Sequence, residues 1–271
     1  MSELERAAEL IDGAGALLVC AGAGMGVDSG LPDFRGDEGF WTAYPPYGRL
    51  GISFVELADP RHFAEDPELA WGFYGHRLAL YRDTVPHDGF GLLLSWGARK
   101  PGGTHAFTSN VDGQFQKAGY PHVAEAHGSI HHLQCLAACT GQIWPADDID
   151  VPIDEDTMRA VAPLPSCPRC GGLARPNILM FGDHDWLGRR SRAQLDELTA
   201  WRRTQRALVV VELGAGQAVP TVRRYAELAS AATGALVRIN PREPQVRHGR
   251  GVSLAGNGLE TLRALDTLLA S

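Results

Sequence analysis

The residues around the first predicted strand bring several kinds of chemically useful side chain close together. An apolar run, 16–20, has the composition of a β-strand. The small residues that follow it are Gly22, Ala23, Gly24 and Gly26. Glycine allows close backbone approach, and a strand that enters a Gly-rich turn is how doubly wound folds hold the pyrophosphate of a dinucleotide. The pattern predicts a nucleotide-binding loop, although such a turn alone is a weak signal.

Four side chains of different chemistry follow these glycines. Pro32 stiffens the chain, and Asp33 supplies a carboxylate. Phe34 adds a flat apolar face, and Arg35 adds a cation. The alternative is a tight turn with a charged, solvated loop, but an ordinary turn does not need this succession of groups. We therefore expect these side chains to lie beside the nucleotide.

Polar residues also follow a second strand-like run, 105–109. Asn110 can donate and accept hydrogen bonds, and Asp112 can orient a water molecule, a ribose hydroxyl or an amide. Polar side chains at the carboxyl end of a parallel strand face the ligand crevice of a doubly wound sheet. An Asx turn before a short helix, 114–118, explains the same two residues about equally well.

His127 is the candidate general base of the chain. It lies in the run Glu125-Ala126-His127-Gly128-Ser129, and the ordinary pKa of histidine lies near neutrality. A single histidine is more often structural, and this chain has ten. His131 and His132 compete for attention, because they lie near the first cysteine pair and could assist a metal or simply be solvated.

Four of the five cysteines form two pairs, Cys135 with Cys139 and Cys167 with Cys170. Two spaced pairs are the usual layout of a four-thiolate zinc site. Glycines after the second pair free backbone N–H groups to point at sulfur. Cys20 lies within the first strand and is most simply a small buried hydrophobe. The pattern predicts one structural Zn²⁺, since a reducing compartment disfavours disulfides.

Strands and helices alternate along much of the chain. The strand-like runs are 16–20, 105–109, 177–180, 207–213 and 235–239, and the clearest helical runs are 68–83, 190–206, 219–233 and 259–269. This alternation predicts an α/β fold with a Rossmann-like, doubly wound parallel sheet covered by helices on both faces.

Two insertions interrupt the alternation. One is an aromatic-rich, mostly helical segment, 41–100, and the other is the cysteine-containing module, 135–172. We expect both to pack side by side as a smaller domain, with the ligand cleft between them and the sheet. The Rossmann-like domain then consists of residues 1–40, 101–134 and 173–271.

The overall composition excludes several classes of partner. With a formal net charge of −7 and a pI near 5.8, we expect neither a nucleic-acid partner nor an anionic membrane partner. No apolar stretch approaches the length of a transmembrane helix, and residues 1–6 are charged and lack a signal-peptide core. These observations predict a cytoplasmic protein.

Taken together and in order, these motifs resemble those of the sirtuin family. The segments that carry the resemblance are the Gly22-Ala23-Gly24 loop, Leu31-Pro32-Asp33-Phe34-Arg35, Thr108-Ser109-Asn110-Val111-Asp112, His127-Gly128, the cysteine pairs, Arg175-Pro176-Asn177-Ile178-Leu179-Met180-Phe181-Gly182-Asp183, Gly214-Ala215-Gly216 and Ile239-Asn240. They extend from about residue 12 to residue 265, which is nearly the whole chain.

The resemblance implies an NAD-dependent protein-lysine deacylase (deacetylase) that releases nicotinamide and O-acyl-ADP-ribose. The implied partner is an acyl-lysine protein or peptide, and a small-molecule substrate is an alternative. NAD is the implied co-substrate, and the Zn²⁺ is structural and lies away from the chemistry because four thiolates leave it no open position.

The resemblance also implies roles for individual residues. His127 is the general base that activates a ribose hydroxyl. Asn110 and Asp112 line the nicotinamide pocket, where Asp112 and Asp33 fix the carboxamide. The remaining implied contacts to NAD are those of Gly22, Ala23, Gly24, Phe34 and Arg35 to the diphosphate and ribose, of Ser109 to the ribose, and of Gly214, Gly216 and Asn240 to the adenosine half.

Several positions depart from the family pattern. Ser109 stands where sirtuins usually carry Gln, Gly26 replaces a Ser, and Gly214-Ala215-Gly216 replaces Gly-Thr-Ser. The run around Ser109 is also similar to that of the macrodomain-linked sirtuins, which look like ADP-ribosyltransferases and lack the His. Two alternatives therefore remain, namely a mono-ADP-ribosyltransferase or NAD glycohydrolase, and a non-catalytic NAD-binding sensor. The intact Asn110, Asp112 and His127 speak against the sensor.

Overall fold

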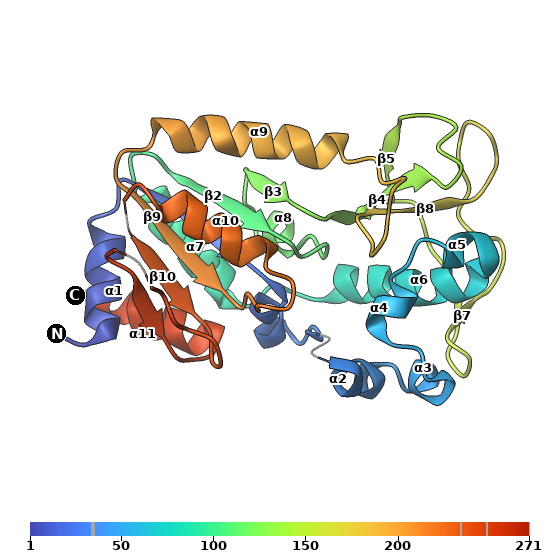
Figure 1. Ribbon diagram of the computed structural model, residues 1–271, viewed down its shortest axis with the longest axis horizontal. Coiled ribbons are helices and arrows are strands. Elements are labelled where there is room, and N and C mark those ends of the chain that lie inside the picture. Colours follow the sequence, from blue (N-terminus) through green and yellow to red (C-terminus); the bar gives the residue numbers. More distant parts are fainter. Residues whose placement is uncertain (34–35, 234, 248, 271) are drawn as a thin grey trace.

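A six-stranded parallel sheet forms the larger part of the molecule (Figure 1). The computed structural model describes residues 1–33, 36–233, 235–247 and 249–270, with the backbone alone for 36–38. The strand order is β11-β10-β9-β1-β2-β3. The strands are β1 (Ala16–Ala21), β2 (Thr104–Thr108), β3 (Val123–Glu125), β9 (Leu208–Leu213), β10 (Leu236–Ile239) and β11 (Val252–Leu254). The doubly wound fold that the alternation predicts is thereby confirmed.

Helices cover both faces of this sheet, because its central strands are apolar on both sides. Leu17 and Val19 of β1 pack into one core, and Leu18 and Cys20 into the other. The first core is closed by α1 (Glu3–Asp12), α7 (Asp88–Ala98) and α11 (Gly258–Leu269). The second is closed by α9 (Arg189–Thr204) and α10 (Thr221–Ser230). Figure 1 shows α9 and α10 on the side of the sheet away from α1 and α11.

The smaller part is built from the two insertions and from strands that lead into it. Its helices are α2 (Gly36–Ala43), α3 (Pro45–Leu50), α4 (Phe54–Leu57), α5 (His62–Glu65) and α6 (Pro67–Asp83), and α8 (Gln114–Lys117) lies after β2. Its strands form a three-stranded antiparallel sheet, β5 (Ile143–Pro145), β4 (Gly128–Cys135) and β8 (Ala174–Ile178), and a hairpin of β6 (Ile153–Asp154) and β7 (Arg159–Ala160).

One aromatic-rich core joins the helical insertion to the cysteine-containing module. Its largest buried rings are those of Phe40, Tyr44, Tyr47, Phe63, Trp71, Phe73 and Tyr74. The indole N–H of Trp71 donates to the carbonyl of Ala174, at 2.9 Å. At Gly72, a Cβ atom would lie 2.0 Å from the carbonyl oxygen of Met158. The glycine therefore lets α6 lie directly against the β6–β7 hairpin.

The sequence-based prediction is wrong about the sheet to which one strand belongs. The sequence predicts a strand of the parallel sheet at 177–180, but the structure has the strand β8 at Ala174–Ile178, and it pairs antiparallel with β4 outside the main sheet. A short run with three apolar residues carries no information about its partner strand, because pairing is decided by contacts distant in sequence. Within the described part of the chain, none of the helices has the length and apolar character needed to cross a membrane.

Candidate active site

The candidate residues gather at one edge of the main sheet, because all six strands are parallel and their carboxyl ends meet there. Gly22 follows β1, Ser109 and Asn110 follow β2, and His127 lies just after β3. Gly214 follows β9 and Asn240 follows β10. The strand order reverses between β1 and β9, and such a switch point is where doubly wound sheets bind ligands. Residues that follow five of the strands therefore lie at one edge of the sheet, around its switch point.

The two glycine loops at this switch point touch each other through their backbones. The N–H of Gly24 donates to the carbonyl of Gly214, at 3.1 Å. A Cβ atom at Gly214, whose φ is +59°, would lie 2.5 Å from the Cα of Gly24. A Cβ atom at Gly22 would lie 2.8 Å from the carbonyl oxygen of Gly214. The glycines are thus needed for the crossing of the two loops, in addition to any approach to a ligand.

Asn110 is tied to the first of these loops. Its side-chain N–H donates to the carbonyl of Gly22, at 3.0 Å, and its backbone N–H donates to the Thr108 hydroxyl, at 3.0 Å. The Thr108 hydroxyl in turn donates to the carbonyl of Ala21, at 2.8 Å. This chain of hydrogen bonds joins the end of β2 to the end of β1. The alternative of an Asx turn does not describe Asn110.

Asp112 does form the Asx turn, and it is buried as well. Its carboxylate accepts from the N–H of Gln114, at 2.9 Å. Burial raises the pKa of Asp112 to about 6, and the charge of Glu125 adds to the rise. His131 Nε2 donates to the backbone carbonyl of Asp112, at 2.9 Å, so this histidine lies beside the candidate pocket. A carboxyl group that titrates near neutrality can accept or donate a hydrogen bond.

His127 lies where the main sheet meets the smaller part. Its carbonyl accepts from the N–H of Leu179, at 2.9 Å, and its Nε2 lies 3.2 Å from the hydroxyl of Thr221. Burial lowers the pKa of His127, which keeps the imidazole neutral at pH 7 and ready to accept a proton. Thr221, at the start of α10, is 94 positions away in sequence, and no local pattern indicates this contact.

Asn240 shapes the second glycine loop. Its side-chain N–H donates to the carbonyl of Ala215, at 3.0 Å, and its side-chain oxygen accepts from the N–H groups of Arg242 and Glu243. The Glu243 carboxylate accepts from the N–H of Gln217, at 3.1 Å. A Cβ atom at Gly216 would approach nothing closer than 4.0 Å. Asn240 therefore holds the loop, and Gly216 leaves its surface open.

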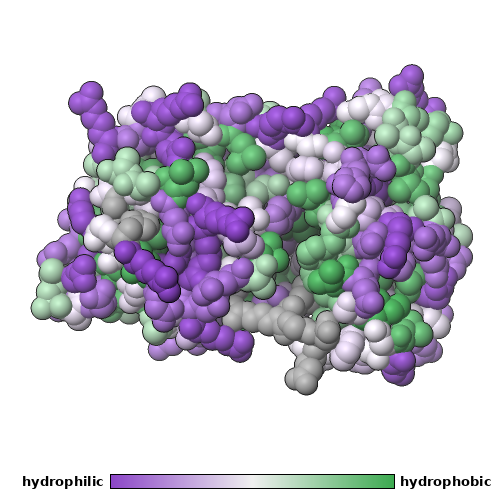
Figure 2. Space-filling view, viewed as in Figure 1, coloured by the Kyte–Doolittle hydropathy of each residue, from purple (hydrophilic) through white to green (hydrophobic). Residues whose placement is uncertain are grey.

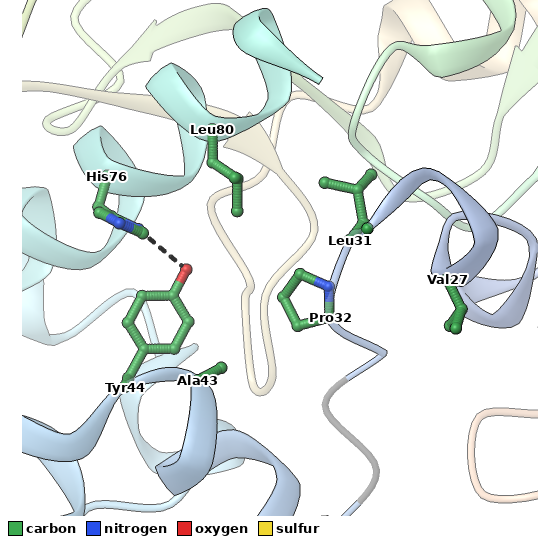
Figure 3. A pocket seen from close by; sticks show the side chains of 8 residues that line it. Val27, Leu31, Pro32, Ala43, Tyr44, His76 and Leu80 are labelled. Carbon is green, nitrogen blue, oxygen red and sulfur yellow. Dashed lines mark hydrogen bonds between the residues drawn. The ribbon is translucent and has the colours of Figure 1, made fainter. Parts of the chain in front are cut away.

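The end of the first loop borders a cavity of about 320 Å³. Its lining residues are Val27, Gly30, Leu31, Pro32, Ala43, Tyr44, His76 and Leu80. Figure 3 shows Leu31 and Pro32 on one side, facing Tyr44, His76 and Leu80 on the other. The Tyr44 hydroxyl lies 3.1 Å from His76 Nδ1. Asp33 is half-buried next to this cavity, and Phe34 and Arg35 lie outside the described residues, so their roles stay predictions.

The surface around this region is mixed in character. Figure 2 shows hydrophilic side chains over much of the larger part and hydrophobic ones gathered toward the middle and over the smaller part. Leu179 and Phe181, which follow β8, are 37% and 41% exposed. The N–H of Leu179 donates to the carbonyl of His127, and the ring of Phe181 lies against that of Phe54, with centroids 6.2 Å apart.

The four paired cysteines form one cluster at the other end of β4. Their sulfur atoms lie within 4.8 Å of one another, with Cys135–Cys170 at 3.8 Å and Cys139–Cys167 at 3.6 Å. Tetrahedral Zn²⁺ with Zn–S bonds of about 2.3 Å separates its sulfurs by about 3.8 Å. Backbone N–H groups of Cys170 and Arg169 lower the pKa of the Cys167 thiol to about 7. The set fits one four-thiolate zinc site, as predicted.

A second cluster of metal-ligand side chains is an aromatic stack. His105, His122 and Glu197 bring their donor atoms within 4.8 Å of one another. The two imidazole rings, however, stack with centroids 4.4 Å apart and planes 9° apart, and His105 also stacks on Trp201. In-plane lone pairs of parallel rings do not converge on one ion. This cluster packs α9 against β2 and β3.

A doubly wound sheet with two touching Gly-rich loops at its switch point defines a dinucleotide-binding class of protein. Comparison with known proteins gives the family. The model of the Sir2 family matches residues 22–219, which is more than half of the chain, and the chain belongs to the Sir2 family. The predicted resemblance to sirtuins is thereby confirmed.

Individual relatives agree with this assignment. The chain is 30% identical to NAD-dependent protein deacylase 1 of Archaeoglobus fulgidus over 92% of this chain and 91% of the relative. It is 31% identical to NAD-dependent protein deacylase 1 of Pseudomonas aeruginosa over 95% of each. A solved complex of a Sir2 homologue with NAD superposes with a TM-score of 0.76 and 26% identity over 97% of this chain and 92% of that one.

Proposed function

We propose that this chain is an NAD-dependent protein-lysine deacylase, which moves the acyl group of an acyl-lysine to ADP-ribose and releases nicotinamide. One observation carries the proposal. The glycine loops, Asn110, Asp112 and His127 lie at one edge of the sheet, around the switch point of a Sir2-family chain whose curated relatives are named NAD-dependent protein deacylases. NAD is the co-substrate, and one structural Zn²⁺ is held by the four clustered cysteines.

The glycine loops bind the nucleotide in this proposal. Bound NAD supplies an anomeric carbon that loses nicotinamide and accepts the acyl oxygen. Ala23 and Gly24 begin a short 3₁₀ turn after β1, where small side chains let a diphosphate approach the backbone closely. Gly214 and Gly216 provide the open surface for the adenosine half, and Asn240 holds them in place.

Asn110 and Asp112 line the pocket from which nicotinamide leaves. Asn110 is held against the glycine loop, so its amide is fixed rather than free to rotate. Asp112, with a pKa of about 6, can hydrogen-bond to a carboxamide from either protonation state. Asp112 is buried and Asn110 is half-buried, which limits the access of water to a site where a cationic carbon must not be hydrolysed.

His127 is the general base. Its neutral imidazole accepts a proton from a ribose hydroxyl, which can then attack the acyl carbon. The hydroxyl of Thr221 fixes the direction of the ring through its contact with Nε2. General-base catalysis of this kind contributes about 100-fold or more to a rate.

The acyl-lysine partner is a protein or peptide that lies along the end of β8. Residues 179–181 follow β8, and the N–H groups of Leu179 and Phe181 donate to the carbonyls of His127 and Ala58, which holds this backbone beside His127. The exposed Leu179 and Phe181 supply apolar contacts for alternate side chains of an added strand.

ADP-ribosyl transfer or NAD hydrolysis is the second candidate, and Ser109 favours it. Its side chain is shorter than the Gln that sirtuins usually carry, and it stands half-buried between β2 and Asn110. Space beside the ribose would let water or another acceptor reach the anomeric carbon.

Incubation with NAD and a set of acyl-lysine peptides distinguishes these reactions. The proposal expects equal amounts of free nicotinamide and O-acyl-ADP-ribose, measured by mass spectrometry, with an unmodified lysine peptide as the control. ADP-ribose attached to protein or released freely, with the acyl peptide intact, would favour the second candidate. Tight NAD binding with no product would contradict both.

A further inference from the structure

His87 lies in the middle of a set of hydrogen bonds that joins helix α7 to the loop after β1. It is the N-cap of α7, and its Nδ1 accepts from the N–H of Gly89, at 3.0 Å. Since Nδ1 accepts, the neutral ring carries its proton on Nε2, which donates to the carbonyl of Met25, at 2.9 Å. The backbone N–H of His87 donates to the Ser29 hydroxyl, at 2.9 Å.

The surroundings hold this ring in one orientation. His87 is 9% exposed, and its ring packs on Phe90 with centroids 4.9 Å apart. A Cβ atom at Gly89 would lie 2.6 Å from His87 Cε1 and 2.7 Å from Leu262 Cδ1. The first turn of α7 therefore carries a glycine, a poor helix former, at a position that leaves room for the His87 ring.

The residues that His87 holds belong to the proposed nucleotide loop. Met25 ends the 3₁₀ turn Ala23–Met25, and its N–H donates to the carbonyl of Gly22, at 3.0 Å. Ser29 ends the next 3₁₀ turn, Val27–Ser29. A second anchor lies between them, because the Asp28 carboxylate accepts from the N–H of Leu259 at the start of α11, at 2.8 Å. Two helix N-termini therefore fix the path of one loop.

We propose that His87 is a positioning residue for NAD binding, which sets the conformation of the loop from Gly22 to Ser29 by donating a hydrogen bond to the carbonyl of Met25. The inference rests on the proposed binding of NAD by this loop. His87 acts through the loop, whose backbone would otherwise have to be ordered at the moment of binding. The expected effect is therefore on NAD affinity, with little change in the rate at saturating NAD.

Two substitutions separate the cap of α7 from the contact with Met25. In His87→Asn, the side-chain oxygen can replace Nδ1 as the acceptor from Gly89, but the shorter side chain does not reach Met25. In His87→Gln, the amide nitrogen can replace Nε2 as the donor to Met25. His87→Ala removes both contacts, and His122→Ala, which changes a 45%-exposed side chain in the stack at α9, is the matched control.

The test measures the Kd for NAD and for ADP-ribose by calorimetry, together with KM and kcat for deacylation. Loss of one hydrogen bond of this kind weakens binding by about tenfold. We expect that loss in His87→Ala and His87→Asn, with kcat within about twofold of the unmodified chain, and a near-normal Kd in His87→Gln and His122→Ala. Faster hydrogen exchange at residues 22–30 should accompany the weaker binding.

Two results would overturn the proposal. One is a normal Kd in His87→Ala; the other is a loss in His87→Gln with a near-normal Kd in His87→Asn, which would assign His87 to the cap of α7 alone. If the unmodified chain binds NAD but does not deacylate, the role of His87 still stands and the proposed reaction falls. If it binds neither NAD nor ADP-ribose, both proposals fall.

Discussion

The two ends of strand β4 hold functional groups in different ways. The strand begins at Gly128, directly after His127. The candidate catalytic groups at this end are held by hydrogen bonds to the backbone and by contacts between the two glycine loops. At its last residue, Cys135, the strand enters a cluster of four thiols. The eight residues of β4 separate the two ends by on the order of 20 Å. Chemistry and metal-dependent folding are therefore separable, and changes at each end should have different consequences.

The largest expected effect lies at the cysteine end. Cys170→Ala removes one of four ligands, and ligand binding energy in such modules is folding energy. We expect aggregated or unfolded protein, whereas Cys20→Ala, which changes a buried cysteine of β1, should retain the metal. Metal analysis should give one zinc per chain in the unmodified protein. A zinc-free chain that folds normally would contradict this account.

At the other end of β4, His127→Ala should leave the fold unchanged and remove the chemistry. We expect turnover to fall by about 100-fold or more, the size of a lost general base, while the Kd for NAD and the melting temperature change little. Deacylation rates and thermal unfolding measure the two quantities. Deacylation by the variant at a near-normal rate would show that another group is the base.

Much of the fold and of the two sites at the ends of β4 could be predicted from the sequence. The apolar runs 16–20, 207–213 and 235–239 match β1, β9 and β10 within about a residue at each end, because buried parallel strands are continuous in composition. The cysteine spacing indicated the thiol cluster. Asn110 and Asp112 could be predicted as site residues because they come directly after the strand β2.

The remaining features depend on contacts between distant segments. Thr221 beside His127 and His87 beside Met25 leave no local pattern, since a single hydroxyl or imidazole has many ordinary uses. The partner strand of β8 could not be predicted from its short local sequence. The spacing of Gly22 and Gly214 indicated a ligand site, but their contact with each other required the folded backbone.

Asp112→Asn tests whether the buried carboxyl group of Asp112 lowers the free energy of unfolding near neutral pH. Burial raises the pKa of Asp112 to about 6, above its ordinary value of 3.8, so the folded state binds the proton more tightly than the unfolded state. Stability is therefore lost as the pH rises from about 4 to 6 and stays lower above 6. Asn keeps the acceptor for the N–H of Gln114 and carries no charge.

We expect Asp112→Asn to raise the free energy of unfolding at pH 7.5 by on the order of 1–3 kcal/mol and to change it little at pH 4. NAD turnover should fall about tenfold, through the weakened contact with nicotinamide. Denaturant titrations at the two pH values and initial rates give both quantities. Unchanged stability together with unchanged turnover would place the nicotinamide pocket elsewhere.

The smallest expected effect concerns Ser109. A short side chain beside the ribose should allow some NAD hydrolysis in competition with acyl transfer. Ser109→Gln should bring the ratio of released nicotinamide to deacylated peptide closer to one, with the total rate changing less than this ratio. A ratio near one in both proteins would show that Ser109 is a neutral substitution.

A crystal structure of the chain with bound ADP-ribose tests the central claim most directly. The account predicts a diphosphate against residues 22–24, the adenosine half against Gly214 and Gly216, and the free ribose within reach of His127 and Asn110. The cysteine cluster should hold its metal at the far end of β4, without contact to the ligand. ADP-ribose bound away from the junction of β1 and β9, with the two glycine loops unliganded, would contradict the account.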